Sequence, residues 1–209
     1  MVIGLLAHRW QQLLPEHPDL GLRLLTRWSE PSRHYHGLEH LAECLDALDV
    51  LGASARAERL ALWFHDAVHA NQAGADERHS AALAEQELAE AGLATAERAE
   101  VSRLILLTIE HRTTLDDHPG ARICDADLAI LAAPRSRYDQ SVRQLRAERP
   151  ELDDRGWQIS RRRRVAELLA RNPLYLTAAG RERWQETARV NLAAEARQLS
   201  ILESARGRG

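Results

Sequence analysis

The chain has 209 residues, which is enough for one sizeable hydrophobic core and few for two. Hydrophobic residues make up 44% and charged residues 28%, an ordinary composition for a globular domain. The formal net charge of -3 argues against binding to nucleic acid or to an anionic membrane. The two cysteines, Cys44 and Cys124, form no CxxC motif, so neither a disulfide framework nor a cysteine zinc site is predicted.

The first residues, MVIGLLAHRWQQLLPEH, contain a short apolar stretch without a basic leader or a small-residue cleavage site. This pattern indicates a first helix rather than a signal peptide. No run approaches the roughly 20 apolar residues that a membrane-spanning helix needs. We therefore expect a cytoplasmic protein.

Helical periodicity runs through nearly the whole chain, while aromatic residues are only 4% and no alternating strand pattern occurs. Segments rich in Ala, Leu, Glu and Arg are strong helix formers, so the sequence predicts an all-α fold. With no repeat and no low-complexity linker, we expect one compact helical domain over residues 1–209. The predicted helices cover about Val2–Leu14, Leu20–Trp28, Gly37–Leu51, Ala55–Ala70, Asp76–Ala91, Ala96–His111, Ile123–Ala132, Arg137–Glu148, Trp157–Ala170 and Arg181–Glu203.

The histidines are clustered. Three of them lie in the seven residues of HYHGLEH, which ends at His40, and two lie in WFHDAVH, at His65 and His69. Neutral imidazole and carboxylate are the usual protein ligands of divalent transition metals. Helical spacing predicts that His36 and His40 share one face near a helix start, and that His69 lies one turn beyond His65.

The pair His65 and Asp66 ends the apolar run LALWF, which indicates that both side chains are buried. An ionised Asp without a partner is costly to bury, so a cation or a hydrogen-bond network is expected beside it. Simpler explanations exist for the other candidates. Asp125 and Asp127 are spaced as helix caps commonly are, and Cys44 suits a small buried hydrophobe better than a soft metal ligand.

The order of these residues, H…HD…D, with the second His about 25 residues after the first, resembles the HD superfamily of helical metal-dependent phosphohydrolases. YHGLEH is similar to the YHxxxH segment of the cyclic nucleotide phosphodiesterases in that superfamily, WFHDAV to its HD helix, and CDADL to the helix that supplies its last Asp. With DERHSA, LTIEHRT, NPLYLT and ARVNLAAE, the likeness extends over most of the chain to an uncharacterised bacterial family of HD phosphohydrolases. The chain departs from that family at His69, where the family has Tyr, and at Ala75–Glu77, where it has Asp-Asn-Glu.

The resemblance implies an HD-type helical bundle, with a metal-binding core at about residues 33–130 and C-terminal helices at about 135–205 packed on it. The implied metal ligands are His40, His65, Asp66 and Asp127. The ion is divalent and its identity is open among Mn, Fe, Ni, Co, Zn and Mg, with a second ion as an alternative. It would polarise a phosphoryl oxygen and lower the pKa of a water molecule that attacks phosphorus.

Five further residues receive implied roles at this site. His36 resembles the general acid of the phosphodiesterases. His69 and Glu77 are candidates to orient the attacking water or to extend the site to a second metal. Arg78 and His111 are candidates to contact the substrate phosphate.

The implied activity is hydrolysis of a phosphomonoester or phosphodiester in a nucleotide or another small phosphorylated metabolite. Two alternatives stay open: a metal- and nucleotide-binding sensor without turnover, and a di-iron oxygenase of the HD type. A small phosphorylated substrate is the expected partner, no nucleic acid or membrane is expected, and a homodimer is left open.

Overall fold

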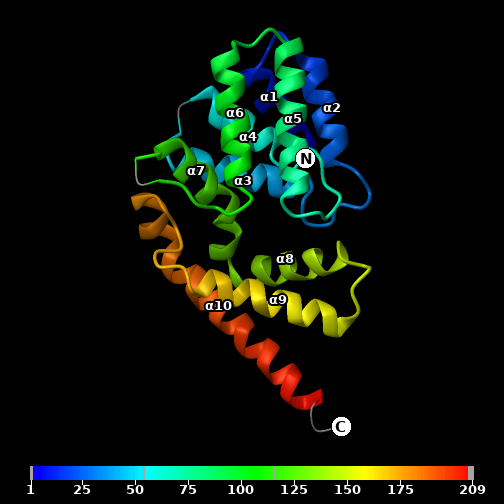
Figure 1. The fold of residues 1–209 in the computed structure, drawn as a ribbon, viewed down its shortest axis with the longest axis vertical. Coiled ribbons are helices and arrows are strands. Elements are labelled where there is room, and N and C mark those ends of the chain that lie inside the picture. The colour runs from blue at the N-terminus through cyan, green and yellow to red at the C-terminus, as the bar shows by residue number, and fades with distance from the viewer. Residues whose placement is uncertain (1, 54, 115, 207–209) are drawn as a thin grey trace. The chain divides into compact units, whose positions relative to one another are not determined.

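The computed structural model describes residues 2–53, 55–114 and 116–206, which form α-helices, one 3-10 helix and loops, with no strand among them (Figure 1). The predicted all-α fold class is confirmed. The α-helices are α1 (Val2–Leu13), α2 (Pro18–Trp28), α3 (Leu38–Val50), α4 (Arg56–Phe64), α5 (Ala75–Glu90), α6 (Thr95–Leu107), α7 (His118–Asp127), α8 (Arg135–Ala147), α9 (Asp154–Leu169) and α10 (Ala178–Arg206), and the 3-10 helix η1 (Leu128–Ala132) follows α7. No helix in this described part is long and apolar enough to cross a membrane.

The chain divides into two compact units, residues 1–128 and 129–209. The first unit contains α1 to α7, and the second contains α8 to α10. Whether the second unit packs on the first as one HD-type domain stays a prediction. All the implied metal ligands lie in the first unit.

Tight helix contacts build the core of the first unit. Trp10 of α1 meets Trp63 of α4 edge to face, with ring centroids 5.0 Å apart. A Cβ atom at Gly21 of α2 would lie 2.2 Å from the Trp10 ring, so this close approach of α2 to α1 requires glycine. The helices α5 and α6 run side by side, and α6 also packs against α4 (Figure 1).

The start of α2 differs from the prediction. The helix α2 begins at Pro18 rather than at the predicted Leu20, because proline lacks an N–H and therefore suits the first turn of a helix.

The end of α4 also differs from the prediction, and this difference matters for the site. The helix ends at Phe64 rather than near Ala70, with His65 as its C-cap residue. The carbonyl of Leu62 accepts a hydrogen bond from His65 Nδ1, and the carbonyl of Trp63 accepts one from Trp28 Nε1. Side chains thus satisfy carbonyls that the next helical turn would otherwise use.

Two further predictions about helix faces are wrong for related reasons. The helix α3 begins at Leu38 with an extended Gly37 as its N-cap, so His36 precedes the helix and does not share a helical face with His40. His69 follows the end of α4, so it does not continue a helical face from His65.

The helix α7 begins at His118, earlier than the predicted Ile123, because Asp117 caps it. The Asp117 carboxylate accepts a hydrogen bond from Gly120 N at 3.0 Å. A Cβ atom at Gly120 would lie 2.2 Å from Asp117 Oδ2, so the cap needs glycine at that position. The predicted helix Ile123–Ala132 is in fact the end of α7 followed by η1.

Candidate metal centre

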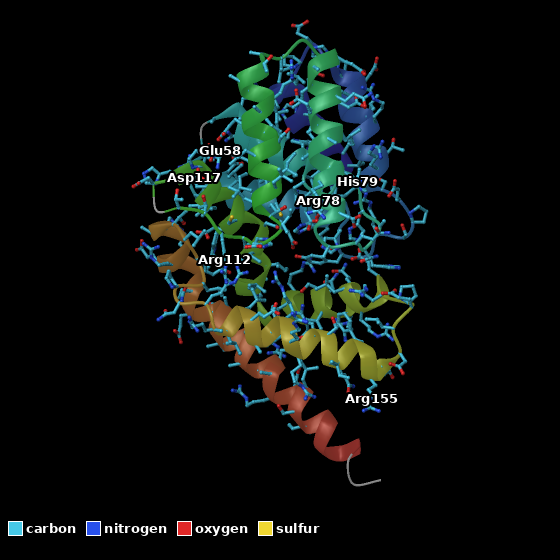
Figure 2. The ribbon with its side chains drawn as sticks, in the orientation of Figure 1. Glu58, Arg78, His79, Arg112, Asp117 and Arg155 are labelled. Atoms are coloured by element: carbon cyan, nitrogen blue, oxygen red, sulfur yellow. The ribbon has the colours of Figure 1, made fainter. Side chains whose placement is uncertain are left out.

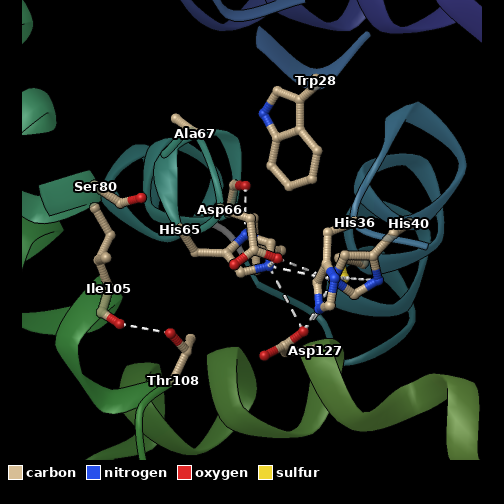
Figure 3. Close-up of polar contacts among 12 residues, drawn as sticks. Trp28, His36, His40, His65, Asp66, Ala67, Ser80, Ile105, Thr108 and Asp127 are labelled. Carbon is tan, nitrogen blue, oxygen red and sulfur yellow. Dashed lines mark hydrogen bonds and ion pairs between the residues drawn. The ribbon is translucent and has the colours of Figure 1, made fainter. Parts of the chain in front are cut away.

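Four polar side chains converge in the first unit from three helix ends. His40 comes from the first turn of α3, His65 and Asp66 from the end of α4, and Asp127 from the last residue of α7 (Figure 3). His40 Nε2 lies 3.3 Å from His65 Nε2 and 3.1 Å from Asp127 Oδ1. The fold therefore brings together the four residues that the sequence singled out.

Asp66 is the fourth member of the group and lies beside both imidazoles. Its Oδ2 atom lies 3.1 Å from His65 Nε2 and 3.6 Å from His40 Nε2, and His65 Nε2 lies 3.6 Å from Asp127 Oδ1. Donor atoms about 2.1 Å from one ion are about 3.0 Å apart at the edge of an octahedron and about 3.4 Å apart at the edge of a tetrahedron. The five measured separations span 3.1 to 3.6 Å, so the donor set fits a divalent ion.

His65 is held in the orientation that a ligand needs. Since the Leu62 carbonyl can only accept, His65 Nδ1 carries the hydrogen and donates to it over 2.8 Å. Nε2, the nitrogen that is free to bind a metal ion when the imidazole is neutral, then faces the other donors. The indole of Trp28 packs against the same imidazole, with centroids 5.4 Å apart (Figure 3).

Asp127 uses its two oxygens differently. Oδ1 faces the imidazoles of His40 and His65, while Oδ2 accepts a 2.7 Å hydrogen bond from His111 Nε2. His111 is buried and has a positive φ of 52°, in the turn that follows α6. The sequence proposed a substrate contact for His111, and that role stays a prediction. The structure adds a contact with Asp127 that fixes the orientation of the carboxylate.

The electrostatics of the group favour ionised carboxylates. Burial alone would raise the pKa of Asp127, but hydrogen bonds from His111, His40 and His65 outweigh it and hold that pKa well below its usual range. Burial likewise opposes the ionisation of Asp66, yet the charges of His65, His36 and His40 lower its pKa. Burial would lower the pKa of His65, but Asp66 and Asp127 raise it well above its ordinary value. The cluster is therefore a place where positive charge is stabilised.

Cys44 is a fifth donor at the edge of this cluster. Its Sγ atom lies 3.6 Å from His40 Nε2 and 4.0 Å from Asp127 Oδ1. His40, Cys44, His65 and Asp127 also form a group whose ligand atoms all lie within 4.8 Å of one another. Burial, and then the charges of Asp127 and Asp66, raise the pKa of the thiol. We favour Asp66 over Cys44 as the fourth ligand because its Oδ2 atom lies 3.1 Å from His65 Nε2. The pKa of Asp66 is also lowered, which favours its charged form, whereas the pKa of the Cys44 thiol is raised.

His36 and His69, two of the candidate catalytic residues, meet each other beside the cluster. Their ring centroids are 4.4 Å apart. The ring of His36 lies 5.7 Å from that of His40 (Figure 3). The turn before α3 thus brings the His36 ring close to that of a candidate metal ligand, although the helical argument for this proximity was wrong.

Glu77 and Arg78 lie at the start of α5. Glu77 Oε2 accepts a hydrogen bond from Gly74 N at 2.6 Å, as in a capping box. Arg78 is exposed on the first turn of the helix, with its guanidinium against Gly74 (Figure 2). A helix cap therefore accounts for Glu77, and the catalytic role for Glu77 and the substrate role for Arg78 stay predictions.

A cavity of about 570 Å³ lies elsewhere in the first unit, and none of its lining residues belongs to the cluster. Three arginines line it, Arg9, Arg56 and Arg59. Each of them already forms an ion pair with an aspartate or glutamate. We assign no function to this cavity, because its positive charges are neutralised by neighbouring carboxylates.

Sequence patterns did not reveal the residues that hold the candidate ligands in place by contacting their neighbouring backbone. Trp28 was placed at the end of a helix without a role, yet its Nε1 atom donates to the carbonyl of Trp63 over 2.9 Å, next to the two ligands at the end of α4. Its place at the end of the predicted helix Leu20–Trp28 gave no signal of this contact.

Comparisons of the chain with protein-family models, with curated proteins and with solved structures found no match.

Proposed function

We propose that this chain is a metal-dependent phosphohydrolase of the HD superfamily that acts on a nucleotide or another small phosphorylated metabolite. The observation that carries the proposal is the set of five separations, 3.1 to 3.6 Å, among the donor atoms of His40, His65, Asp66 and Asp127. Together with the H…HD…D order of the sequence, this donor set supports a hydrolase better than it supports a purely structural network.

Two imidazoles and two carboxylates suit Mn, Fe, Ni, Co, Zn or Mg, and we propose one such ion at this site. When bound, the ion supplies a Lewis acid that polarises a phosphoryl oxygen and activates water. His111 keeps the Asp127 carboxylate turned toward the site by donating to its outer oxygen.

His36 is the proposed proton donor to the leaving group. The ring of His36 is half-buried and packs against His40 and His69. It therefore lies beside the proposed ion site but is not one of the ligands. His36 would hold a proton for the oxygen of the leaving group, and His69 would keep the His36 ring in place. Glu77 would help to orient the attacking water, and Arg78 would offer its guanidinium to the substrate phosphate.

The first test is the metal content of the purified protein by elemental mass spectrometry, for the wild type and for Asp66→Ala. Phosphate release is measured in parallel from a panel of nucleotides and phosphate esters. We expect about one ion per chain in the wild type, its loss in the variant, and phosphate release that depends on the metal. His118→Ala, at an exposed histidine, is the matched control and keeps its metal.

Other outcomes separate the alternatives. Absence of bound metal after reloading with manganese, iron and zinc would overturn the proposal. Bound metal with nucleotide-dependent stabilisation but no phosphate release would favour the sensor. Two irons per chain with oxygen consumption would favour the oxygenase.

A further inference from the structure

The guanidinium of Arg33 joins the two turns that carry the site. Nη1 donates to the carbonyl of His36 over 3.1 Å and to the carbonyl of Asp66 over 2.6 Å, and Nη2 donates to the carbonyl of Ala67 over 3.2 Å. One of these turns precedes α3 and presents His36. The other follows α4 and presents His65 and Asp66. A single side chain therefore fixes the separation of two loops that are about 30 residues apart in the sequence.

The same side chain completes the end of α4. Leu62 and Trp63 give their carbonyls to His65 Nδ1 and Trp28 Nε1. The Phe64 carbonyl accepts from the backbone N–H of Ala67, and Arg33 engages the carbonyls of Asp66 and Ala67 further along the turn. A positive charge at a helix C-terminus also interacts favourably with the helix dipole.

The burial of the Arg33 guanidinium indicates that this charge has a structural role at this point in the fold. Its side chain is 1% exposed, and a buried charge without partners is strongly unfavourable. Glu30 offsets the charge through an ion pair at 3.0 Å, and the guanidinium lies 5.6 Å from the centre of the Trp28 ring. Trp28 in turn packs against the imidazole of His65.

Only arginine can make this set of contacts. Its planar fork presents five donors in fixed directions, whereas lysine presents a compact ammonium that cannot reach three carbonyls on two loops with the same geometry. A change from arginine to lysine therefore keeps the positive charge but loses the arrangement of hydrogen bonds to the three carbonyls.

We infer that Arg33 is a positioning residue that sets the metal affinity of the site, by holding the turn of Asp66 against the turn of His36. This inference rests on the proposed metal centre. It makes Arg33 neither a ligand nor a group that touches the substrate. Partners that orient metal ligands from behind typically contribute about 10- to 100-fold to metal affinity.

The test compares the wild type, Arg33→Lys and Arg98→Lys, using Co²⁺ and Zn²⁺ as probes. Arg98 is the matched control, because its guanidinium joins Glu85 of α5 and the carbonyl of Leu93 in the turn before α6, each at 2.8 Å, rather than the turns that carry the ligands. Circular dichroism first establishes that each variant is folded at the temperature of the titration. We expect Arg33→Lys to bind both ions at least about tenfold more weakly, and Arg98→Lys to bind them as the wild type does.

The visible absorption of the Co²⁺ protein is the second readout, since its intensity depends on the coordination geometry and not on overall stability. The inference predicts an altered spectrum for Arg33→Lys and an unchanged one for Arg98→Lys. Metal affinity within about twofold of the wild type and the wild-type spectrum in Arg33→Lys would overturn the inference while leaving the proposed function intact. Failure of the wild type to bind either ion would instead overturn the proposed function.

If Arg33→Lys does not fold, Arg33→Gln answers the same question, because its shorter amide removes the guanidinium that joins the carbonyls of His36, Asp66 and Ala67. Weaker metal binding by folded Arg33→Gln supports the inference, and unchanged binding overturns it.

Discussion

Asp127 shows how one side chain can serve two neighbours at the residue scale. Its Oδ1 atom faces the imidazoles, and its Oδ2 atom accepts from His111. Replacing His111 with Ala removes the hydrogen bond to that outer oxygen and lets the carboxylate rotate. We expect metal affinity to fall by about 10- to 100-fold in His111→Ala. Isothermal titration with Zn²⁺ measures the change, and His118→Ala, at an exposed histidine, should bind like the wild type.

Cys44 and Asp66 offer a second test at the same scale, because either could complete the set formed by His40, His65 and Asp127. The Asp66 oxygen lies 3.1 Å from His65 Nε2, and the pKa of the Cys44 thiol is raised by burial. We expect Cys44→Ala to keep one ion per chain, with affinity within about threefold of the wild type. A metal-free Cys44→Ala protein, measured by elemental mass spectrometry, would show that the thiolate is a ligand.

The cap of α7 is the corresponding feature at the scale of elements, since this helix carries Asp127 at its other end. The Asp117 carboxylate accepts hydrogen bonds from Arg103, Thr113 and the backbone N–H of Gly120 (Figure 2 labels Asp117). The hydrogen bond from Arg103 is the largest cause that lowers the pKa of Asp117 to about 2. Its carboxylate therefore stabilises the fold fully above the ordinary aspartate pKa of about 4, and this contribution is lost as the pH falls through about 2.

We expect Asp117→Ala to lower the free energy of unfolding by about 0.5–2 kcal/mol near neutral pH, as loss of a helix N-cap does. The difference from the wild type should shrink as the pH falls from about 4 toward about 2. Urea denaturation at a series of pH values measures it, with Asp116→Ala, at an exposed position, as the control. A difference that stays constant down to the lowest pH would contradict the proposed contribution of the charge.

At the scale of the whole molecule, the second unit has a buried polar centre of its own. Arg161 of α9 forms a two-point ion pair with Glu195 of α10, at 2.7 and 3.0 Å, and Tyr138 of α8 donates to the same carboxylate. Burial, together with the charge of Glu195, raises the pKa of Tyr138. One carboxylate thus joins the three helices of this unit.

Removing that carboxylate would leave a buried guanidinium without its partner. We expect Glu195→Ala to lower the free energy of unfolding by about 3–5 kcal/mol. Glu167→Ala, which breaks the exposed pair with Arg163, should cost at most about 1 kcal/mol. Chemical denaturation followed by circular dichroism measures both. The metal content of folded Glu195→Ala should equal that of the wild type, because the proposed ligands belong to the first unit, and loss of the ion would contradict this assignment.

The sequence by itself determined the helical fold class, because periodicity and helix-forming composition act locally and extend through the chain. It also singled out His40, His65, Asp66 and Asp127, since their order matches a known pattern. Helix ends were less well predicted. The end of α4 depends on carbonyls that Trp28 and Arg33 engage from another part of the chain, and no local propensity encodes such contacts.

Only the tertiary structure decided how the site is assembled. It brought His36 to His40 through a turn rather than along a helix, and it placed His111 against the outer oxygen of Asp127. It also showed that Glu77 caps α5. These arrangements depend on side-chain contacts between residues far apart in the sequence. Such contacts form only when the helices pack, because burial then makes each polar group find a partner.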